Sequence, residues 1–165
     1  MNALSRELIE RIRGEIPDLE RVTQRILRAW PHAHRSSEAQ NVYLDSVALN
    51  LHSFYSGLER LFELIARHLD QNLPAGEVWH RDLLVQMSHD LACVRPAVIS
   101  EATAHRLDEY RRFRHLVRNV YTVNLAPEKM SGLITALPKL WADLQAELLA
   151  FADFLEDLCC AQSAE

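Results

Sequence analysis

The segment from Tyr110 to Tyr121 places cationic, imidazole, amide and phenol groups on one predicted helix. Arg114 and Arg118 are four residues apart and Tyr121 follows three residues later, so these side chains project from neighbouring turns of one helical face. Two guanidinium groups this close repel each other unless an anion lies between them. Because a guanidinium fork matches a phosphate with two hydrogen bonds, the pair favours the phosphate of a nucleotide or a nucleic acid as its ligand.

The same arginines also have a simpler interpretation. Arginine-rich helical faces are usually solvated surfaces on which ion pairs form, and Asp108 and Glu109 lie close enough in the sequence to be the partners. From the residue types alone, this ion-paired surface is the more frequent outcome. A binding or catalytic function for the helix therefore needs support from other parts of the chain.

Four stretches of the sequence, taken together, carry a family resemblance. They are Leu51–Phe62, Trp79–Leu84, Arg95–Ile99 and Phe113–Tyr121. In order and spacing they resemble segments of HEPN-domain proteins, in particular the HepT-like toxins of prokaryotic toxin–antitoxin pairs, and they cover the chain from about Leu44 to Phe154. The resemblance implies metal-independent cleavage of RNA.

The family motif is placed on this sequence residue by residue. HEPN proteins carry an arginine followed, after four to six residues, by a histidine, and HepT-like toxins often have a tyrosine two residues further on. The arginine falls here on Arg114 and the tyrosine on Tyr121, but Asn119 occupies the position of the histidine. By resemblance these three are the candidate catalytic residues. Possible accessory groups on the same helix are His115, Arg118 and Tyr110.

Asn119 is the main departure from the family pattern. Asparagine donates and accepts hydrogen bonds but does not exchange a proton near neutral pH, whereas histidine does. If the family's cleavage of RNA needs an imidazole there as acid or base, its loss is expected to lower the rate by about 10²–10⁴. His115 follows Arg114 directly and offers another imidazole, although it lies on a different side of the helix from Tyr121.

The resemblance also implies partners. In the family two subunits bring their motif helices together, so we expect a homodimer, with RNA as the possible substrate at the cleft between the subunits. A cognate nucleotidyltransferase antitoxin neutralises such toxins by transferring AMP to a tyrosine, which corresponds here to Tyr121. No cofactor is expected.

Two further hypotheses stay open. A HEPN module that has lost cleavage through Asn119 would keep the fold and the nucleotidyltransferase partner and would act as a binding or regulatory subunit. A purely structural helical adaptor would show neither cleavage of RNA nor affinity for phosphate.

Length and composition fit one cytoplasmic domain. The chain has 165 residues, of which 48% are hydrophobic, and we expect a single HEPN-like domain over residues 1–165. A net charge of −5 argues against a general nucleic-acid coat protein. The excess of negative charge lies in the acidic run from Glu128 to Glu165. The sequence shows no apolar secretory segment at its start and no stretch near the length of a membrane span. Its three cysteines fit neither a disulfide framework nor a zinc pattern.

The apolar pattern predicts an all-α, antiparallel bundle of about five helices. The first helix extends through residues 1–35, where Gly14 and Pro17 are expected to kink or break it and Pro31 to end it. The second follows the most regular apolar stripe in the chain, from Leu44 to Leu69. Such a stripe indicates the core of a bundle, although dimerisation through a coiled coil is an alternative.

The other three helices have clearer end signals. A short helix is expected from about Val78 to Leu91, and Ser100 is placed to cap the helix that carries the arginines. The acidic final helix spans residues 128–160, where Pro127 suits the first turn and Pro138 is expected to kink or split the helix.

Other polar residues give weaker signals. Neither His80 with Glu77 nor the remaining histidines have the paired ligand spacing of a helical metal site, so we predict no metal centre. Tyr55 and Glu59 lie beside the apolar stripe of the second helix and are expected to lean toward the arginine helix. A hydrogen-bonded, partly buried polar group is more common at such positions than a ligand or a base.

Overall fold

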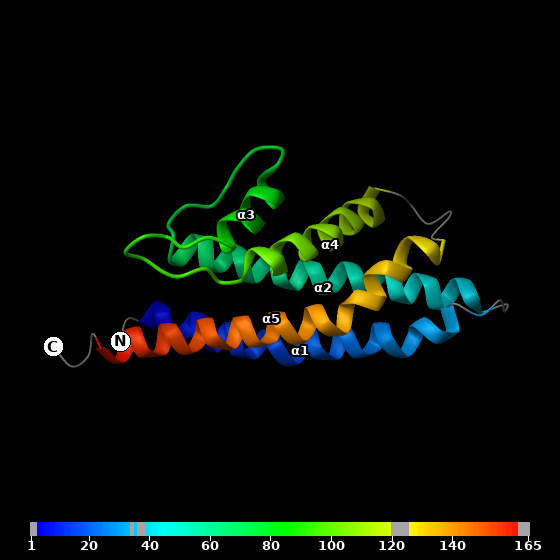
Figure 1. The fold of residues 1–165 in the computed structure, drawn as a ribbon, viewed down its shortest axis with the longest axis horizontal. Coiled ribbons are helices and arrows are strands. Elements are labelled where there is room, and N and C mark those ends of the chain that lie inside the picture. The colour runs from blue at the N-terminus through cyan, green and yellow to red at the C-terminus, as the bar shows by residue number, and fades with distance from the viewer. Residues whose placement is uncertain (1–2, 34, 36–38, 120–125, 162–165) are drawn as a thin grey trace.

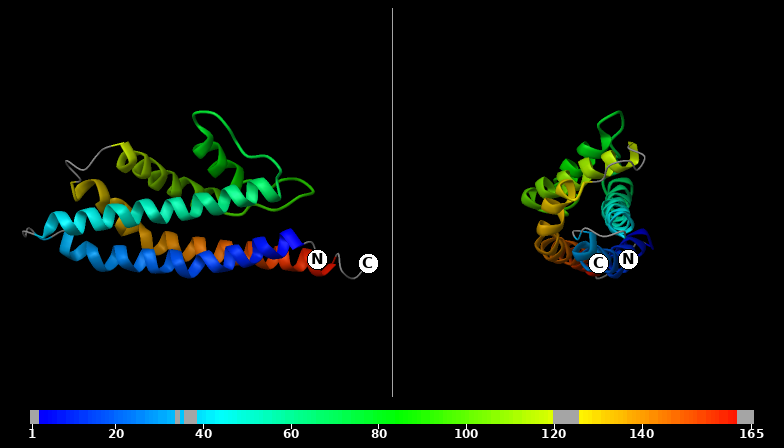
Figure 2. Two further views of the ribbon diagram at one scale, coloured as in Figure 1. Left: turned by 180° about the vertical axis from the view of Figure 1, so that it is seen from behind. Right: turned by 90° about the vertical axis from the view of Figure 1, so that its right-hand side faces the viewer.

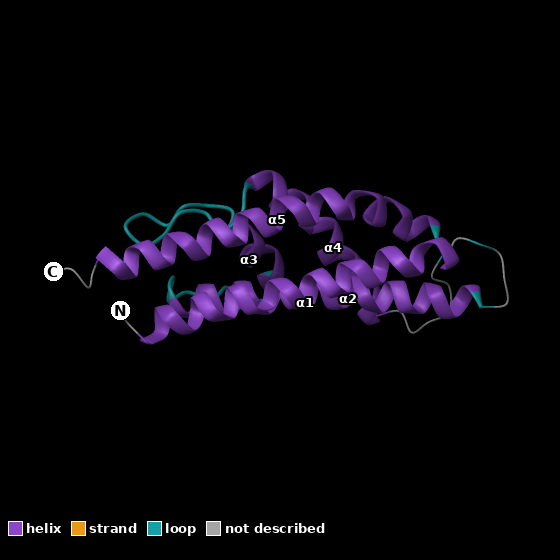
Figure 3. Cartoon of the chain, turned by 90° about the horizontal axis from the view of Figure 1, so that it is seen from below, coloured by secondary structure: helices purple, strands orange, loops and turns teal. Residues whose placement is uncertain are grey.

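Five helices account for most of the chain in the computed structural model. It describes residues 3–33, 35, 39–119 and 126–161, with side chains from residue 6 onward in the first helix and up to residue 117 in the fourth. Figure 3 shows helices joined by loops, with no strand in these ranges. The helices are α1 (Ala3–Ala33), α2 (Gln40–His68), α3 (Trp79–Met87), α4 (Glu101–Asn119) and α5 (Glu128–Ala161).

The four long helices run alternately in opposite directions (Figure 1). Each packs against two neighbours in the cyclic order α1, α2, α4, α5. The short α3 packs against α2 and α4, and the end-on view in Figure 2 shows it on the outside of the bundle. The prediction of an all-α bundle of about five helices is therefore confirmed.

The core follows the predicted stripe of α2. Leu51, Phe54 and Leu58 are each at most 1% exposed. The ring of Phe54 lies 5.8 Å from that of Tyr110 on α4 and 6.1 Å from that of Trp141 on α5, measured between centroids. Full burial of one such side chain stabilises the fold by about 1.5–3 kcal/mol. This core fixes how α2 and α4 are rotated about their axes, and so determines where their polar side chains emerge.

The first helix is continuous although Gly14 and Pro17 lie inside it. Of the two alternatives predicted at these residues, a kink or a break, the continuous helix excludes the break. A proline in a helix interior costs about 3 kcal/mol, but Ile12 and Leu19, on either side of Pro17, are both almost fully buried. Their burial offsets the lost backbone hydrogen bond. Pro31 does not end the helix either, which continues for one more half-turn to Ala33.

The last helix is also continuous, since Pro138 lies inside α5 without splitting it. Figure 1 shows a change of direction between the yellow start of α5 and its orange remainder. A proline displaces the carbonyl of the preceding turn and so produces bends of this kind. The helix begins directly after Pro127, as its sequence predicted.

The short third helix ends at Met87, four residues before the predicted end. Ser88 Oγ and His89 Nδ1 each donate a hydrogen bond to the carbonyl of Val85, at 2.8 Å in both cases. Side chains that bond to the backbone in this way compete with continued helix formation. The local polar residues thus explain why α3 stops early.

A buried ion pair anchors the loop between α3 and α4. Arg95 Nε and Nη2 each lie 2.6 Å from a carboxylate oxygen of Asp70, and the two side chains are 0% and 1% exposed. Arg95 also donates to the carbonyls of Gln86, His89 and Pro96 at 3.0–3.2 Å. These five hydrogen bonds match the five N–H donors of a guanidinium group.

A close approach of α1 to α2 occurs at Gly57. A Cβ atom at this position would lie 3.0 Å from Glu15 Oε1 and 3.1 Å from Leu19 Cδ2, both on α1. The missing side chain therefore lets α1 pack tightly behind the part of α2 that includes Ser56 and Glu59.

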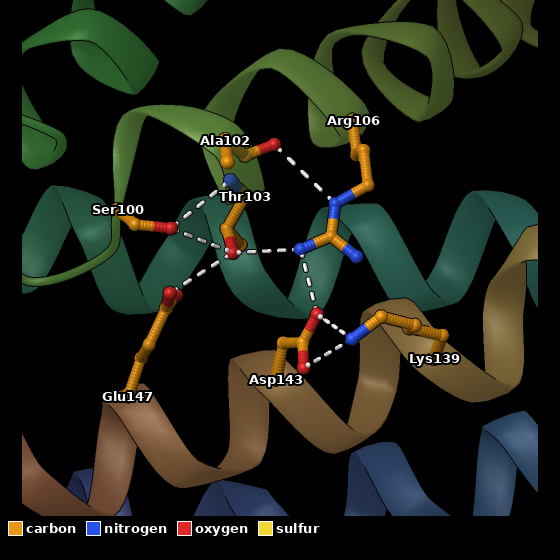
Figure 4. Close-up of polar contacts among 7 residues, drawn as sticks. All are labelled: Ser100, Ala102, Thr103, Arg106, Lys139, Asp143 and Glu147. Carbon is orange, nitrogen blue, oxygen red and sulfur yellow. Dashed lines mark hydrogen bonds and ion pairs between the residues drawn. The ribbon is translucent and has the colours of Figure 1, made fainter.

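A polar network joins the start of α4 to α5 (Figure 4). Thr103 Oγ1 donates to Glu147 Oε1 at 3.0 Å, and Arg106 Nη2 lies 2.8 Å from Asp143 Oδ2. The backbone N–H of Thr103 donates to Ser100 Oγ at 3.2 Å. Ser100 directly precedes α4 and caps it, as the sequence predicted.

This cap gives a first testable prediction. Replacing Ser100 with alanine is expected to lower the free energy of unfolding by about 1 kcal/mol, because the N–H group of Thr103 loses its acceptor. Ser100→Gly is the matched control and should cost only a few tenths of a kcal/mol. Urea unfolding followed by circular dichroism measures both, and an alanine variant as stable as the wild type would contradict the capping role.

Candidate functional site

The side chain of Arg114 extends from α4 to α2. Tyr110 and Phe113, which are close to Arg114 in the sequence of α4, are buried in the core. Its Nε donates to Ser56 Oγ at 3.0 Å, and its Nη2 lies 3.0 Å from Glu59 Oε1. The side chain of Arg114 is 16% exposed and that of Glu59 is 4% exposed. The guanidinium group is therefore held in one orientation by α2 while part of it still faces solvent.

Glu59 connects Arg114 to a third helix. Its second oxygen, Oε2, accepts a hydrogen bond from His80 Nδ1 on α3 at 2.7 Å. The ring of Trp79 lies against that of His80, with centroids 3.7 Å apart. Arg114, Glu59 and His80 thus form one cluster across α4, α2 and α3, which we call the Arg–Glu–His cluster.

The two partners explain how Glu59 is tolerated in the interior. An ionised carboxylate loses several kcal/mol of hydration on burial unless charged or hydrogen-bonding groups replace the water. Arg114 supplies the opposite charge and His80 a second hydrogen bond, one on each carboxylate oxygen. The prediction that Glu59 leans toward the arginine helix is confirmed. The partner of His80 is Glu59 rather than Glu77.

Tyr55 lies one helical turn before Glu59 and is 1% exposed. Burial raises the pKa of the Tyr55 phenol above its ordinary value, and the negative charge of Glu59 adds to this. The positive charges of Arg111 and Arg114 act in the opposite direction but do not compensate. The phenol therefore stays protonated at neutral pH and does not act there as a base.

The arginines on the outer side of α4 form ion pairs, as the simpler interpretation predicted. Arg111 Nε lies 2.7 Å from Asp108 Oδ1, and Arg112 Nε lies 2.8 Å from Asp108 Oδ2. Partial burial favours protonation of Asp108, but the hydrogen bonds and charges of these two arginines outweigh it and hold the pKa of the carboxyl below its ordinary value. Arg114 differs from them because its carboxylate partner belongs to another helix.

Tyr110 is a core residue. It is 2% exposed, and its hydroxyl group donates to the carbonyl of Leu133 on α5 at 2.7 Å. Burial raises the pKa of this phenol as well. The structure thus directs Tyr110 toward α5, which corrects the expectation that it is an accessory group of the site.

The other predicted site residues lie at the end of α4. The side chain of His115 is exposed. The backbone of α4 continues to Asn119, but the side chains of Arg118 and Asn119 and the whole of Tyr121 lie outside the described residues.

A groove of about 460 Å³ lies between α3 and α4. It carries arginines and histidines from both helices and from the turn after α3, interspersed with carboxylates. Its basic and imidazole side chains are Arg81, His89, His105, Arg111 and Arg112.

The described residues lack two other kinds of feature. No group of three or more potential ligands capable of holding a metal ion occurs among the described residues. In the same part of the chain, no helix is both long enough and apolar enough to cross a membrane.

The fold and the cluster define an all-α bundle with an arginine-centred polar site between three helices. A family model described as HepT-like protein matches residues 46–155, about two thirds of the chain. The protein therefore belongs to the HepT-like family, which confirms the resemblance seen in its sequence. No curated protein and no solved structure matches it.

Sequence reasoning missed the contacts of Ser56 and His80 with Arg114 and Glu59. Both residues lie within stretches that carried the resemblance, Leu51–Phe62 and Trp79–Leu84. The available signal was a carboxylate beside the apolar stripe of α2, since a buried carboxylate requires partners.

Proposed function

We propose that this protein is a HEPN-type toxin that cleaves RNA without a metal ion, with Arg114 as the residue that binds the scissile phosphate. The observation that supports the proposal is that Ser56 and Glu59 both contact the guanidinium group of Arg114 and hold it in one orientation. A guanidinium group has five N–H donors, more than these two acceptors use, and an oriented fork binds phosphate at a lower entropic cost than a free one.

The proposed reaction follows from the charges of RNA. Arg114 neutralises the phosphate as the neighbouring ribose 2′-hydroxyl attacks it, and thereby stabilises the charge that develops on the phosphoryl oxygens. Asn119 orients the reacting groups. In keeping with the family, the site forms where two copies of the chain meet.

Regulation is proposed to act through Tyr121. A cognate nucleotidyltransferase antitoxin would transfer AMP to the phenol, and the added phosphate would then compete with RNA for the arginine. Incubation of the protein with such a partner and ATP tests this step, with mass spectrometry locating the modified residue.

The test of the catalytic proposal is cleavage of mixed cellular RNA by the purified protein in excess EDTA. The expected products carry 2′,3′-cyclic phosphate ends. Absence of cleavage by a folded protein would instead support a non-catalytic HEPN module that binds nucleotide or RNA. Two observations favour that second candidate, namely Asn119 at the histidine position and the partial neutralisation of Arg114 by Glu59.

Position 119 provides a direct prediction. If the site has no other imidazole base, Asn119→His is expected to raise the rate of RNA cleavage by about 10²-fold, because it adds an imidazole where the family motif has one. Asn119→Gln keeps an amide and is the matched control, which should not gain activity. Equal rates in Asn119→His and the wild type would show that an imidazole at this position is not limiting.

A further inference from the structure

We infer that His80 supplies the imidazole that the motif lacks at position 119, and that it acts as the general base on the ribose 2′-hydroxyl. The inference rests on the proposed function. Three features of the described residues support it: the orientation of the ring, its exposure, and the carboxylate that it shares with Arg114.

The hydrogen bond to Glu59 fixes the tautomer of His80. A carboxylate only accepts hydrogen bonds, so Nδ1 carries the proton that is donated to Glu59 Oε2 over 2.7 Å. In the neutral ring, Nε2 then has the free electron pair and can accept a proton. A carboxylate that holds Nδ1 in this way also stabilises the imidazolium that forms, as in carboxylate–histidine pairs that serve as catalytic bases.

The imidazole of His80 is more exposed to solvent than its carboxylate partner. The side chain of His80 is 23% exposed, whereas that of Glu59 is 4% exposed. The carboxylate is therefore shielded while part of the imidazole faces solvent. Trp79 packs against the ring and restricts its rotation.

The shared carboxylate brings the two functional groups together. Arg114 contacts Oε1 of Glu59 and His80 contacts Oε2, so the guanidinium and the imidazole flank a single carboxylate. A phosphodiester bound to Arg114 has its attacking 2′-hydroxyl on the neighbouring ribose, a few bonds from phosphorus. The arrangement thus provides one group for the phosphate and one for the adjacent hydroxyl.

The chemical step balances with water as the only additional reactant. His80 Nε2 takes the proton of the 2′-hydroxyl as the 2′-oxygen bonds to phosphorus and the bond from phosphorus to the 5′-oxygen breaks. The leaving 5′-oxygen takes a proton from water, and the imidazolium returns its proton to the resulting hydroxide. The products are a 2′,3′-cyclic phosphate and a 5′-hydroxyl end.

A purely structural role of His80 makes different predictions. In that case the imidazole only satisfies the buried carboxylate, and any side chain that donates a hydrogen bond to Glu59 would replace it. His80→Gln is the discriminating variant, because the glutamine amide donates to a carboxylate but does not accept a proton near neutral pH.

The experiment compares RNA cleavage in EDTA by the wild type, His80→Gln and Arg114→Ala. The control is His68→Gln, the same substitution at an exposed residue at the end of α2. We expect His80→Gln to lower kcat by about 10²–10³-fold with unchanged thermal unfolding, and His68→Gln to cleave at the wild-type rate. Asn119→His introduced into His80→Gln is expected to restore cleavage.

The pH dependence of kcat provides a readout that a structural role would not change. The wild type should lose activity at acidic pH as a single base becomes protonated, and this limb should be absent from the residual activity of His80→Gln. Of the titratable and charged groups in this region, Glu59 on α2 contacts the imidazole directly, and Arg114 on α4 contacts the other oxygen of Glu59. Asp108 and Arg111 on α4 act, together with Glu59 and Arg114, on the nearby Tyr55 of α2, and Arg81 and Asp82 follow His80 along α3.

Three outcomes overturn the inference, and they are distinguishable. If the wild type cleaves RNA and Arg114→Ala does not, but His80→Gln retains the wild-type rate and pH profile, His80 is not the base and the proposed function stands. If the wild type does not cleave RNA at any pH, the inference and the proposed function fail together. If His80→Gln is unfolded, the wild-type profile decides, because a rate with no acidic limb excludes an imidazole base.

Discussion

Replacing Arg114 with alanine is expected to abolish RNA cleavage, with a loss of at least about 10³-fold in kcat/KM, because the phosphate loses the guanidinium group that Ser56 and Glu59 hold in place. Arg112→Ala is the matched control. Arg112 lies on the same helix, its side chain is 64% exposed, and its ion pairs are with Asp108 and Glu109 on that helix. Cleavage of RNA in EDTA measures both variants, and activity that persists in Arg114→Ala would refute the site.

The stability of Arg114→Ala has to be separated from its activity. Loss of Arg114 leaves the buried Glu59 with His80 as its remaining partner, which we expect to cost about 2–3 kcal/mol, less than for a fully buried pair. Adding Glu59→Gln removes the unpaired charge and should recover part of that stability. Because the double variant still lacks the guanidinium, it should fold and yet not cleave RNA.

The second large effect concerns stability alone. Replacing Arg95 with methionine is expected to lower the free energy of unfolding by about 3–5 kcal/mol, because Asp70 becomes a buried and uncompensated charge. The carbonyls of Gln86, His89 and Pro96 lose a donor as well. Urea unfolding measures the change.

An exposed ion pair serves as the control for Arg95. Arg67 lies 3.4 Å from Glu63 on the surface of α2 and is 57% exposed, so Arg67→Met should change the free energy of unfolding by less than about 1 kcal/mol. Asp70→Ala breaks the same buried pair as Arg95→Met, so the double variant should cost less than the sum of the single costs. Additive costs would show that the two residues do not stabilise each other.

Much of the fold follows from features that are local in the sequence. The apolar stripe of α2, the cap at Ser100 and the proline before α5 all act within a few turns of one helix, and each prediction from them is confirmed. The early end of α3 was not predicted, and the sequence left open whether α1 kinks or breaks at Pro17. At Pro17 burial against neighbouring helices outweighs a local preference, and a local pattern does not contain that information.

In the candidate site, too, features that are local in the sequence were predicted, whereas contacts between separate helices were not. Arg114 was identified from the resemblance of its segment, Phe113–Tyr121, to the family motif, and Glu59 from its position beside an apolar stripe. The hydrogen bond between His80 and Glu59 joins residues 21 apart in the sequence, and Arg95 and Asp70 are 25 apart. Such pairs depend on how separate helices are rotated and stacked, which spacing along one helix does not determine.

The close approach at Gly57 bears on how much of the chain is needed for a working site. The match to the HepT-like family begins at residue 46, whereas Glu15 and Leu19, which pack against Gly57, lie well before it. A fragment limited to residues 46–155 would lack α1 and would expose to solvent the face of α2 at Gly57, next to Ser56 and near Glu59 in the sequence. Any family member that has only that region must cover α2 with another surface. A working site therefore needs more of the chain than residues 46–155, by which the family is recognised. A transfer of the site to another protein would have to include α1 as well.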